Sequence, residues 1–183
     1  MSPLVIILLA AFVVIVVGFV LYGAKLSPKW EVSAIKSIKA DRETLYDYVN
    51  NIENWERWTV WSKEVNPNFE FTYEGSRSGT GATQCWKAKG HSGKTKICGG
   101  ERPDQLRFML TFGHGGHMVK GCLTFKTVGN ETEVTWRMHG DSGTNPSRKI
   151  MARMMAPYMR RDMESGLGRL KAVMEDKSSK WEH

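Results

Sequence analysis

Residues 105–138 read QLRFMLTFGHGGHMVKGCLTFKTVGNETEVTWRM, and their apolar side chains recur at every second position. The alternation holds at residues 106–112, again at 119–125 and again at 134–138, with glycine or Gly-Asn between the segments. Because successive side chains of a strand point to opposite faces, this spacing predicts strands joined by hairpins. One face of the resulting antiparallel sheet is apolar and must be covered by another element.

The same alternation extends the sheet toward the N-terminus. Apolar residues alternate at 69–73 and 82–86, before turn residues, and residues 94–101 form a weaker member of the series. Before these strands, residues 30–40 are predicted to form the first strand of the domain. We therefore expect a run of short antiparallel strands through most of the chain.

The segment between the first predicted strand and the later strands has apolar residues at helical spacing. Asp41 is placed to cap a helix over residues 42–51. Trp55, Trp58 and Trp61 follow at intervals of three, which puts them on one side of a helix or turn. They form either part of the core or the wall of a pocket.

A long amphipathic helix is predicted to close the chain and cover the sheet. Asn145 can cap it, and Pro146 suits its first position. Gly166 and Gly168 each disfavour a helix by about 1 kcal/mol, which predicts a close approach to a neighbour or a bend. The apolar positions that recur three or four apart are Ile150, Met154, Met155, Tyr158, Met159, Met163, Leu167, Leu170 and Met174.

The N-terminus holds an apolar run, residues 4–22, without a charged side chain. As a helix, about 20 such residues span the roughly 30 Å hydrocarbon core of a bilayer. The alternative is a cleaved secretory signal, which requires basic residues ahead of the run and small residues at a cleavage site. Residues 1–3 carry no charged side chain and residues 21–25 lack an Ala-x-Ala site, so an anchor is favoured.

The cations that flank this run predict its orientation. Lys25 and Lys29 follow the run and none precedes it, and cytoplasmic flanks collect Lys and Arg. We therefore expect a single-pass membrane protein whose large domain faces the cytoplasm. The predicted units are a transmembrane helix at 1–23, a linker at 24–29, a folded domain at 30–176 and a flexible tail at 177–183.

The chain is basic, with 26 Lys and Arg against 19 Asp and Glu and a net charge of +7. A cation beside an anionic leaflet gains roughly 1 kcal/mol, so contact with a membrane surface explains this balance. Nucleic-acid binding is not expected, because it calls for a basic stripe interleaved with aromatic residues. The nearest feature is a set of cations near the C-terminus, interpreted as a solvated helix face: Arg148, Lys149, Arg153, Arg160, Arg161 and Arg169.

The order of elements and several motifs resemble the helix-grip superfamily (SRPBCC, START-like), which includes START lipid-transfer domains, polyketide cyclases and dehydrases, and plant Bet v 1-like proteins. The most specific motifs are IKADRETLY at 38–46 and NWERWTVW at 54–61, supported by TEVTW at 132–136 and GLGRLK at 166–171. These are fold signatures and not catalytic ones. The resemblance covers nearly all of the chain beyond the apolar run. It implies an α+β fold in which a curved antiparallel sheet wraps around the long C-terminal helix, with a hydrophobic cavity between them.

With that resemblance, the methionines and aromatic rings of sheet and helix predict a pocket for an apolar ligand. The alternative is that they fill an ordinary core. Gln84 is in phase with Trp86 and is expected to be the inward polar group, whereas Arg137 and His139 are expected to face solvent. The residues predicted to contact the ligand are Trp58, Trp61, Gln84, Trp86, Phe108, Trp136, Met138, Met155, Tyr158 and Met159.

No catalytic, metal or cofactor site is expected. His114 and His117 lack a third ligand nearby. Cys85, Cys98 and Cys122 are odd in number, widely spaced and without an adjacent histidine, so they predict no disulfide framework, zinc site or activated nucleophile.

The sequence thus predicts a membrane-anchored binding module for a hydrophobic small molecule such as a lipid, an isoprenoid or a polyketide-like compound. Two alternatives remain open: an enzyme of the cyclase or dehydrase kind that uses the same cavity, and a protein-interaction domain of the stress-chaperone-regulator branch. The identity of the ligand and the oligomeric state are also open at this point.

Overall fold

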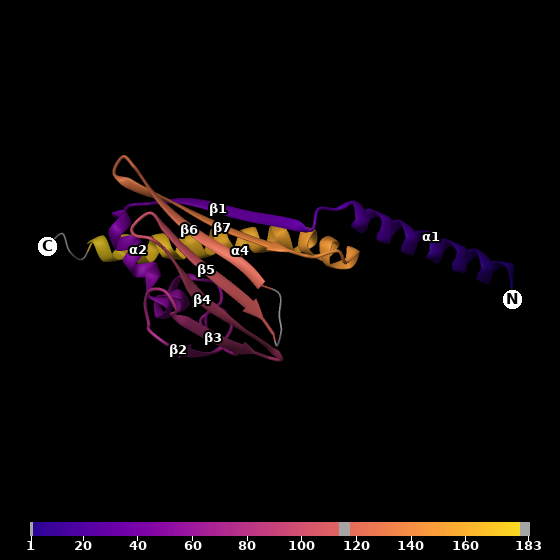
Figure 1. The fold of residues 1–183 in the computed structure, drawn as a ribbon, viewed down its shortest axis with the longest axis horizontal. Helices are drawn as coiled ribbons and strands as arrows, with labels where there is room; N and C mark the ends of the chain where they lie inside the picture. The colour runs from indigo at the N-terminus through magenta and orange to yellow at the C-terminus, as the bar shows by residue number, and fades with distance from the viewer. Residues whose placement is uncertain (1, 114–117, 180–183) are drawn as a thin grey trace.

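The computed structural model describes residues 2–113 and 118–179, with side chains described as far as residue 176. It contains a seven-stranded sheet, a long C-terminal helix that crosses the sheet, and an N-terminal helix that stands apart (Figure 1). In chain order the elements are α1 (Pro3–Lys25), β1 (Lys29–Ile38), α2 (Arg42–Asn50), the 3-10 helix η1 (Ile52–Asn54), α3 (Trp55–Trp58), β2 (Glu70–Glu74), β3 (Thr83–Ala88), β4 (His91–Glu101), β5 (Gln105–Phe112), β6 (Met118–Val128), β7 (Glu131–Asp141) and α4 (Pro146–Ser179).

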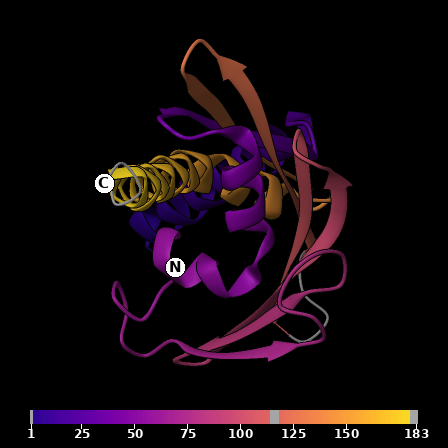
Figure 2. The ribbon, with the colours of Figure 1, turned by 90° about the vertical axis from the view of Figure 1, so that its left-hand side faces the viewer.

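The sheet is antiparallel throughout. Strands β2 to β7 follow one another as neighbours, and β1 completes the sheet by pairing with β7, with Lys29 opposite Asp141. The sheet curves around α4 (Figure 2). A register shift between Ile97 and Gly99 marks a bulge in β4, and bulges bend a strand and increase its twist. The predicted antiparallel sheet with a covering helix is confirmed.

The inward and outward faces follow the predicted alternation. Trp136 and Met138 of β7 are buried, whereas Arg137 and His139 on the same strand are exposed. Gln84 of β3 also points inward, with 5% of its surface exposed. The sheet therefore presents one apolar face to the helices, as its sequence period requires.

The helix α2 begins where the sequence predicts. The Asp41 carboxylate accepts a hydrogen bond from the Thr44 amide at 2.7 Å and another from the Thr44 hydroxyl at 2.6 Å. This satisfies backbone donors that the first turn of a helix leaves without partners. The cap fixes the turn between β1 and α2, whose buried face packs against the sheet through Leu45 and Val49.

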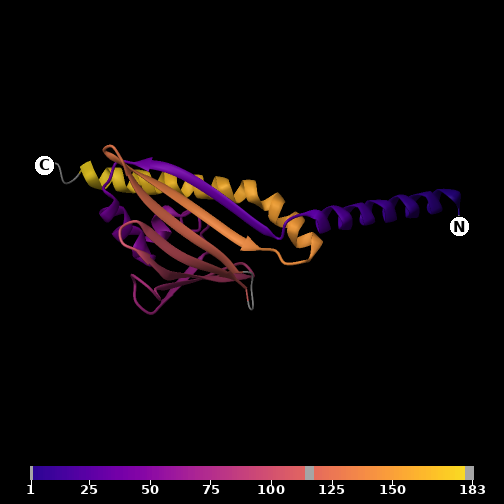
Figure 3. The same cartoon turned by 45° about the horizontal axis from the view of Figure 1, so that its top comes forward.

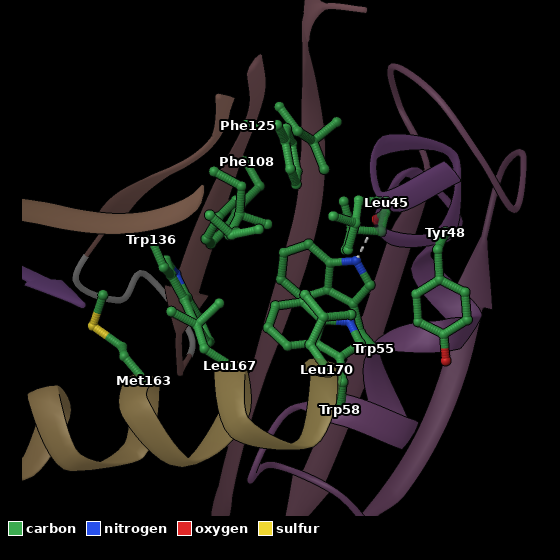
Figure 4. Packing of buried hydrophobic residues seen from close by; sticks show 14 of the residues in the cluster. Leu45, Tyr48, Trp55, Trp58, Phe108, Phe125, Trp136, Met163, Leu167 and Leu170 are labelled. Atoms are coloured by element: carbon green, nitrogen blue, oxygen red, sulfur yellow. Dashed lines mark hydrogen bonds between the residues drawn. The ribbon is translucent and has the colours of Figure 1, made fainter. Parts of the chain in front are cut away.

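Aromatic rings form the centre of the core, between the sheet and the helices (Figure 4). The Trp55 ring meets Phe108 edge to face at 4.8 Å between centroids, and the Trp58 ring meets Trp136 at 5.0 Å. The Trp55 indole N–H donates to the Val49 carbonyl at 2.7 Å. Edge-to-face pairs contribute about 0.5–1.5 kcal/mol beyond their buried area, so this cluster fixes how the short helices meet the sheet.

At Gly166 the backbone of α4 lies close to the aromatic cluster. A β-carbon at this position would lie 3.0 Å from Cζ3 of Trp136. The predicted close approach is therefore confirmed at Gly166. At Gly168 a β-carbon would have no neighbour within 4 Å, so no close approach requires a glycine there.

The long helix α4 is capped as predicted, because the Asn145 side chain accepts a hydrogen bond from the Ser147 amide at 3.0 Å. Its 34 residues span about 51 Å, whereas a strand of 11 residues spans about 36 Å. Pro157 lies inside α4 and removes one backbone hydrogen bond, and the helix changes direction in its N-terminal half (Figure 3).

The apolar stripe of α4 is buried over only part of its length. Met163, Leu167, Leu170 and Met174 are buried and Met159 is half-buried, but Met151, Met154 and Met155 are exposed. The sequence pattern predicts one continuous covering face, and the structure departs from it in the first half of the helix. The physical reason is length: the helix is longer than the sheet and changes direction in its N-terminal half (Figure 3), so its first turns extend beyond the core.

The helix α1 runs away from the sheet, and no residue of its most apolar 18-residue stretch is buried. Its mean hydropathy of 3.5 and its 23 residues make it long and apolar enough to cross a membrane, since about 20 residues suffice. A helix with these properties near an N-terminus serves either as a membrane anchor or as a signal sequence.

Candidate functional site

A mainly apolar groove lies where the first half of α4 passes the ends of β1, β6 and β7. We call it the α4 groove, and its volume is about 320 Å³. Its apolar wall consists of Trp30, Met118, Val119, Met151, Ala152, Met155 and Met159. Asp141, Ser142, Ser147 and Arg148 add polar groups. A groove of this size and composition can hold an elongated apolar molecule with one polar end.

Trp30 is held in this groove by the pairing of β1 with β7. It lies opposite Gly140, and a β-carbon on Gly140 would come within 2.6 Å of the Trp30 ring. The indole therefore lies directly over position 140, where any residue other than glycine would push the ring away. An aromatic side chain that covers a glycine on the neighbouring strand stabilises the pair and also fixes the ring as a wall of the groove.

A second, enclosed cavity lies between the short helices and strands β2 to β5. Its volume is about 50 Å³, which is room for a few water-sized groups and far below the roughly 300 Å³ of a small-molecule pocket. Phe69, Phe71, Trp61, Gln84 and Trp86 contribute to its lining. None of the described residues of α4 lines it, so this cavity lies between the sheet and the short helices and not between the sheet and the long helix, where the superfamily resemblance implies one.

The enclosed cavity borders a small hydrogen-bonded cluster. The Tyr73 hydroxyl donates to a carboxylate oxygen of Glu56, and the Gln84 amide donates to the Tyr73 oxygen at 3.4 Å. Burial, together with the hydrogen bond to Glu56, raises the pKa of Tyr73 to about 12. The phenol therefore stays protonated and serves as a hydrogen-bond donor near neutral pH.

The structure divides the ten predicted ligand residues among four environments. Trp61, Gln84 and Trp86 line the enclosed cavity, and Met155 and Met159 line the α4 groove. Tyr158 is exposed and lines neither space. The remaining four, Trp58, Phe108, Trp136 and Met138, belong to the packed core.

Ligand contact stays a prediction for all ten residues. Among the core members, the indole N–H groups of Trp58 and Trp136 have no hydrogen-bond acceptor within the described residues. Both rings are 0–1% exposed, so a ligand would reach them only if the core opened. The α4 groove needs no such opening.

Sequence reasoning identified only Met155 and Met159 among the residues that line the α4 groove, and the residues that it missed include Trp30, Met118, Met151 and Arg148. Met118 and Trp30 stand at strand ends, where the alternating pattern begins or stops and predicts little. Met151 and Arg148 lie in the first turns of α4. A signal was present in the methionine spacing, because Met151, Met155 and Met159 recur at every fourth position.

No group of three or more His, Cys, Asp or Glu residues suited to a metal ion occurs within the described ranges. The His114 and His117 pair lies outside those ranges. The three cysteines are unpaired. Burial raises the pKa of the Cys85 and Cys122 thiols, which disfavours the reactive thiolate.

A curved antiparallel sheet that wraps around a long C-terminal helix defines the helix-grip class of α+β proteins. The sequence profile described as "Polyketide cyclase / dehydrase and lipid transport" matches residues 29–175. The chain belongs to this family. No curated protein sequence matches it significantly.

Solved structures share the fold at low sequence identity. DynU16, from the dynemicin biosynthetic locus, superposes with a TM-score of 0.55 and 16% identity, over 79% of this chain but only 47% of its own. The Aha1 dimer from Colwellia psychrerythraea has a TM-score of 0.55 and 16% identity, over 80% of this chain and 96% of its own. The hypothetical protein jhp0584 from Helicobacter pylori has a TM-score of 0.58 and 15% identity, over 81% of this chain and 89% of its own. At such identities the likeness shows the fold alone.

Proposed function

We propose that this protein is a membrane-anchored binding module for a hydrophobic small molecule, with α1 as the anchor and the α4 groove as the binding site. The observation that carries the proposal is the α4 groove itself: it has a volume of about 320 Å³, four methionines and Trp30 contribute to its apolar wall, and it is formed in part by the first turns of α4, which begin against the end of α1. The family description, which includes lipid transport, agrees with an apolar ligand.

The lining of the α4 groove indicates the kind of ligand. Thioether side chains are flexible and polarisable, so they adapt to apolar chains of different shapes. At the polar side, Asp141 accepts a hydrogen bond from Gly143, and the Ser147 hydroxyl donates to Asn145. Arg148 is left as a cation without an ion pair to described residues. A lipid, isoprenoid or polyketide-like molecule with an anionic or strongly polar end matches this arrangement.

The orientation that we propose places the folded domain in the cytoplasm. It rests on Lys25 and Lys29, which follow the apolar helix, because cytoplasmic flanks are enriched in cations. Protease added to inverted membrane vesicles should then digest the domain. A domain that stays protected in such vesicles would reverse the orientation.

Native mass spectrometry of the full chain taken from its host membrane, with lipid extraction of the same sample, tests the ligand proposal. The Ala152→Trp variant places an indole in the α4 groove, because Ala152 lines it. The matched control is Ala172→Trp, which changes an exposed alanine of the same helix. We expect a stoichiometric apolar ligand on the wild-type and control proteins and its loss from Ala152→Trp. An empty wild-type protein, or equal retention by both variants, would exclude the α4 groove as the site.

A second candidate is an enzyme of the cyclase or dehydrase kind, favoured by the hydrogen-bonded cluster of Glu56, Tyr73 and Gln84 beside the enclosed cavity. An acid and a phenol in contact are groups that move protons in such reactions. Turnover of a polyketide-like chain that disappears in Glu56→Gln, while ligand retention is unchanged, would support this candidate. Turnover that survives this substitution would exclude the cluster as its acid or base.

A further inference from the structure

We infer that the first half of α4 is a membrane-contact surface that binds the headgroups of anionic lipids beside the anchor. The surface consists of an apolar ridge, formed by Met151, Met154, Met155 and Tyr158, and of the two arginines that flank it, Arg148 and Arg161. This inference uses the anchor of the proposed function but does not depend on the ligand of the α4 groove.

The ridge is apolar surface that the domain leaves uncovered. Met151 is 58% exposed, Met154 63% and Tyr158 59%. Their spacing of three and four residues places them on one side of the helix. On the same helix, Met163 and Met174 are only 1–2% exposed. Contiguous exposed apolar side chains with a polar border are typical of protein or membrane contacts.

The charge around the ridge is of one sign. Residues 146–161 contain five cations and no acidic residue, and the first carboxylate of α4 is Asp162. Arg148 precedes Met151 by three positions and Met155 by seven, and Arg161 follows Tyr158 by three and Met154 by seven. These spacings place both arginines beside the ridge. Neither forms an ion pair with a described residue, so both are available to lipid phosphates.

The start of α4 is fixed to the end of the anchor. A β-carbon on Gly23 of α1 would lie 2.6 Å from Cβ of Pro146, and the buried Lys149 ammonium donates to the Ala24 carbonyl at 3.3 Å. Figures 1 and 3 show α1 leaving the domain beside the first turns of α4. When α1 spans a bilayer, these first turns must lie at its surface. The α4 groove, which shares Met151 and Met155 with the ridge, then opens toward the lipid headgroups.

A lipid surface fits this face better than a second copy of the chain. A two-fold dimer would place this basic surface of one copy against the same basic surface of the other, and their like charges would repel. An anionic leaflet instead attracts cations near its surface, and apolar side chains enter the boundary between headgroups and acyl chains. The juxtaposition of ridge, arginines and anchor is the arrangement expected of a helix that lies on a membrane.

The test measures methionine oxidation in the full chain, reconstituted into nanodiscs of phosphatidylcholine alone or mixed with phosphatidylglycerol. A brief hydrogen peroxide pulse is followed by peptide mass spectrometry, and Met163 and Met174 serve as buried internal references. We expect Met151, Met154 and Met155 to oxidise up to about thirtyfold more slowly in the anionic discs, because two cations gain attraction there. The double variant Arg148→Glu/Arg161→Glu should remove this protection.

The matched control is Arg153→Glu/Arg160→Glu, which makes the same change of charge on the side of α4 away from the ridge and should keep most of the protection. Equal oxidation rates in the two kinds of disc would overturn the inference, as would equal effects of the two double variants. If oxidation is slow in both lipids, and only in discs that hold two chains, the ridge is a dimer contact and the inference is overturned. A chain that does not incorporate into discs would overturn the anchor as well, whereas an unprotected ridge in an incorporated chain leaves the anchor and the ligand site intact.

Discussion

Gly23, near the end of α1, lies against Pro146, the first residue of α4, so closely that a β-carbon at position 23 would come within 2.6 Å of Cβ of Pro146. Gly23 is also the one residue of α1 that is buried. The apolar helix is therefore packed against the folded domain at this point. The packing determines which surface of the domain faces a membrane when α1 spans one.

Substitution of Gly23 by valine should loosen this junction. The added side chain would collide with the backbone of Pro146, whose carbonyl oxygen is 2.8 Å from the ideal β-carbon. For each roughly 1 kcal/mol of packing lost, trypsin cleavage after Lys25 or Lys29 should accelerate about fivefold. Gly18→Val in the same helix, where a β-carbon meets nothing within 4 Å, should leave the rate unchanged. Equal rates for both variants would show that the junction does not restrain the linker.

The two methionine environments of α4 predict different costs of truncation. Met163→Ala empties a buried site and should reduce the free energy of unfolding by about 2–5 kcal/mol. Met154→Ala removes an exposed side chain of the same helix and should change it by no more than about 0.5 kcal/mol. Urea unfolding of the full chain in detergent, followed by tryptophan fluorescence, measures both. Similar costs would mean that the first half of α4 is as firmly packed as the second.

The paired glycines of α4 provide a second comparison. Gly168→Ala should raise the free energy of unfolding by up to about 1 kcal/mol, because alanine favours a helix and its methyl group meets nothing within 4 Å. Gly166→Ala should gain less or lose stability, because its methyl group would press on Trp136 at 3.0 Å. Thermal unfolding measured side by side distinguishes them. An equal gain at both positions would indicate that the Trp136 ring moves aside without cost.

The cap of α2 predicts a pH dependence of stability. The hydrogen bonds from the Thr44 hydroxyl and amide hold the pKa of Asp41 below its usual value. A carboxylate with a lowered folded-state pKa contributes stability above its unfolded-state pKa, and that contribution is lost as the pH falls through the folded-state pKa. Asp41→Ala should therefore cost about 1 kcal/mol at pH 7 and progressively less as the solution is acidified below about pH 4.

Asp41→Asn is the control for the cap, because asparagine accepts the same backbone hydrogen bond and does not titrate. It should keep most of the stability at pH 7. Urea midpoints at neutral and acidic pH measure both variants. A cost for Asp41→Ala that is the same at every pH would show that the charge of the carboxylate contributes nothing to the cap.

The elements of the fold could be predicted because each depends on residues that are close in sequence. The alternation at residues 106–112 and 119–125 predicts strands whichever strand they pair with. Asp41 caps its helix through Thr44, three positions away. The aromatic and methionine content also predicted an apolar interior, and the structure places Phe108 and Trp136 at its centre.

The candidate site could be predicted only in part. Phase along strands identified Gln84 as an inward polar residue, but phase does not reveal how much space remains in front of a side chain. Phe69 and Phe71 are among the side chains that surround that space, which is an enclosed cavity of only about 50 Å³. The volumes of residues from several distant segments decide this result, and a linear pattern carries no information about their sum.

The sequence by itself determined the seven strands, the capped helices, the apolar N-terminal helix and the basic charge of the first half of α4, because these follow from local periodicity and composition. Only the tertiary structure decided that Trp30 lies on Gly140 and that α4 passes beyond the sheet before Met163. Both results depend on the register of β1 against β7 and on the relative lengths of helix and sheet. The α4 groove and the exposed ridge come from that geometry, which brings together residues from opposite ends of the domain.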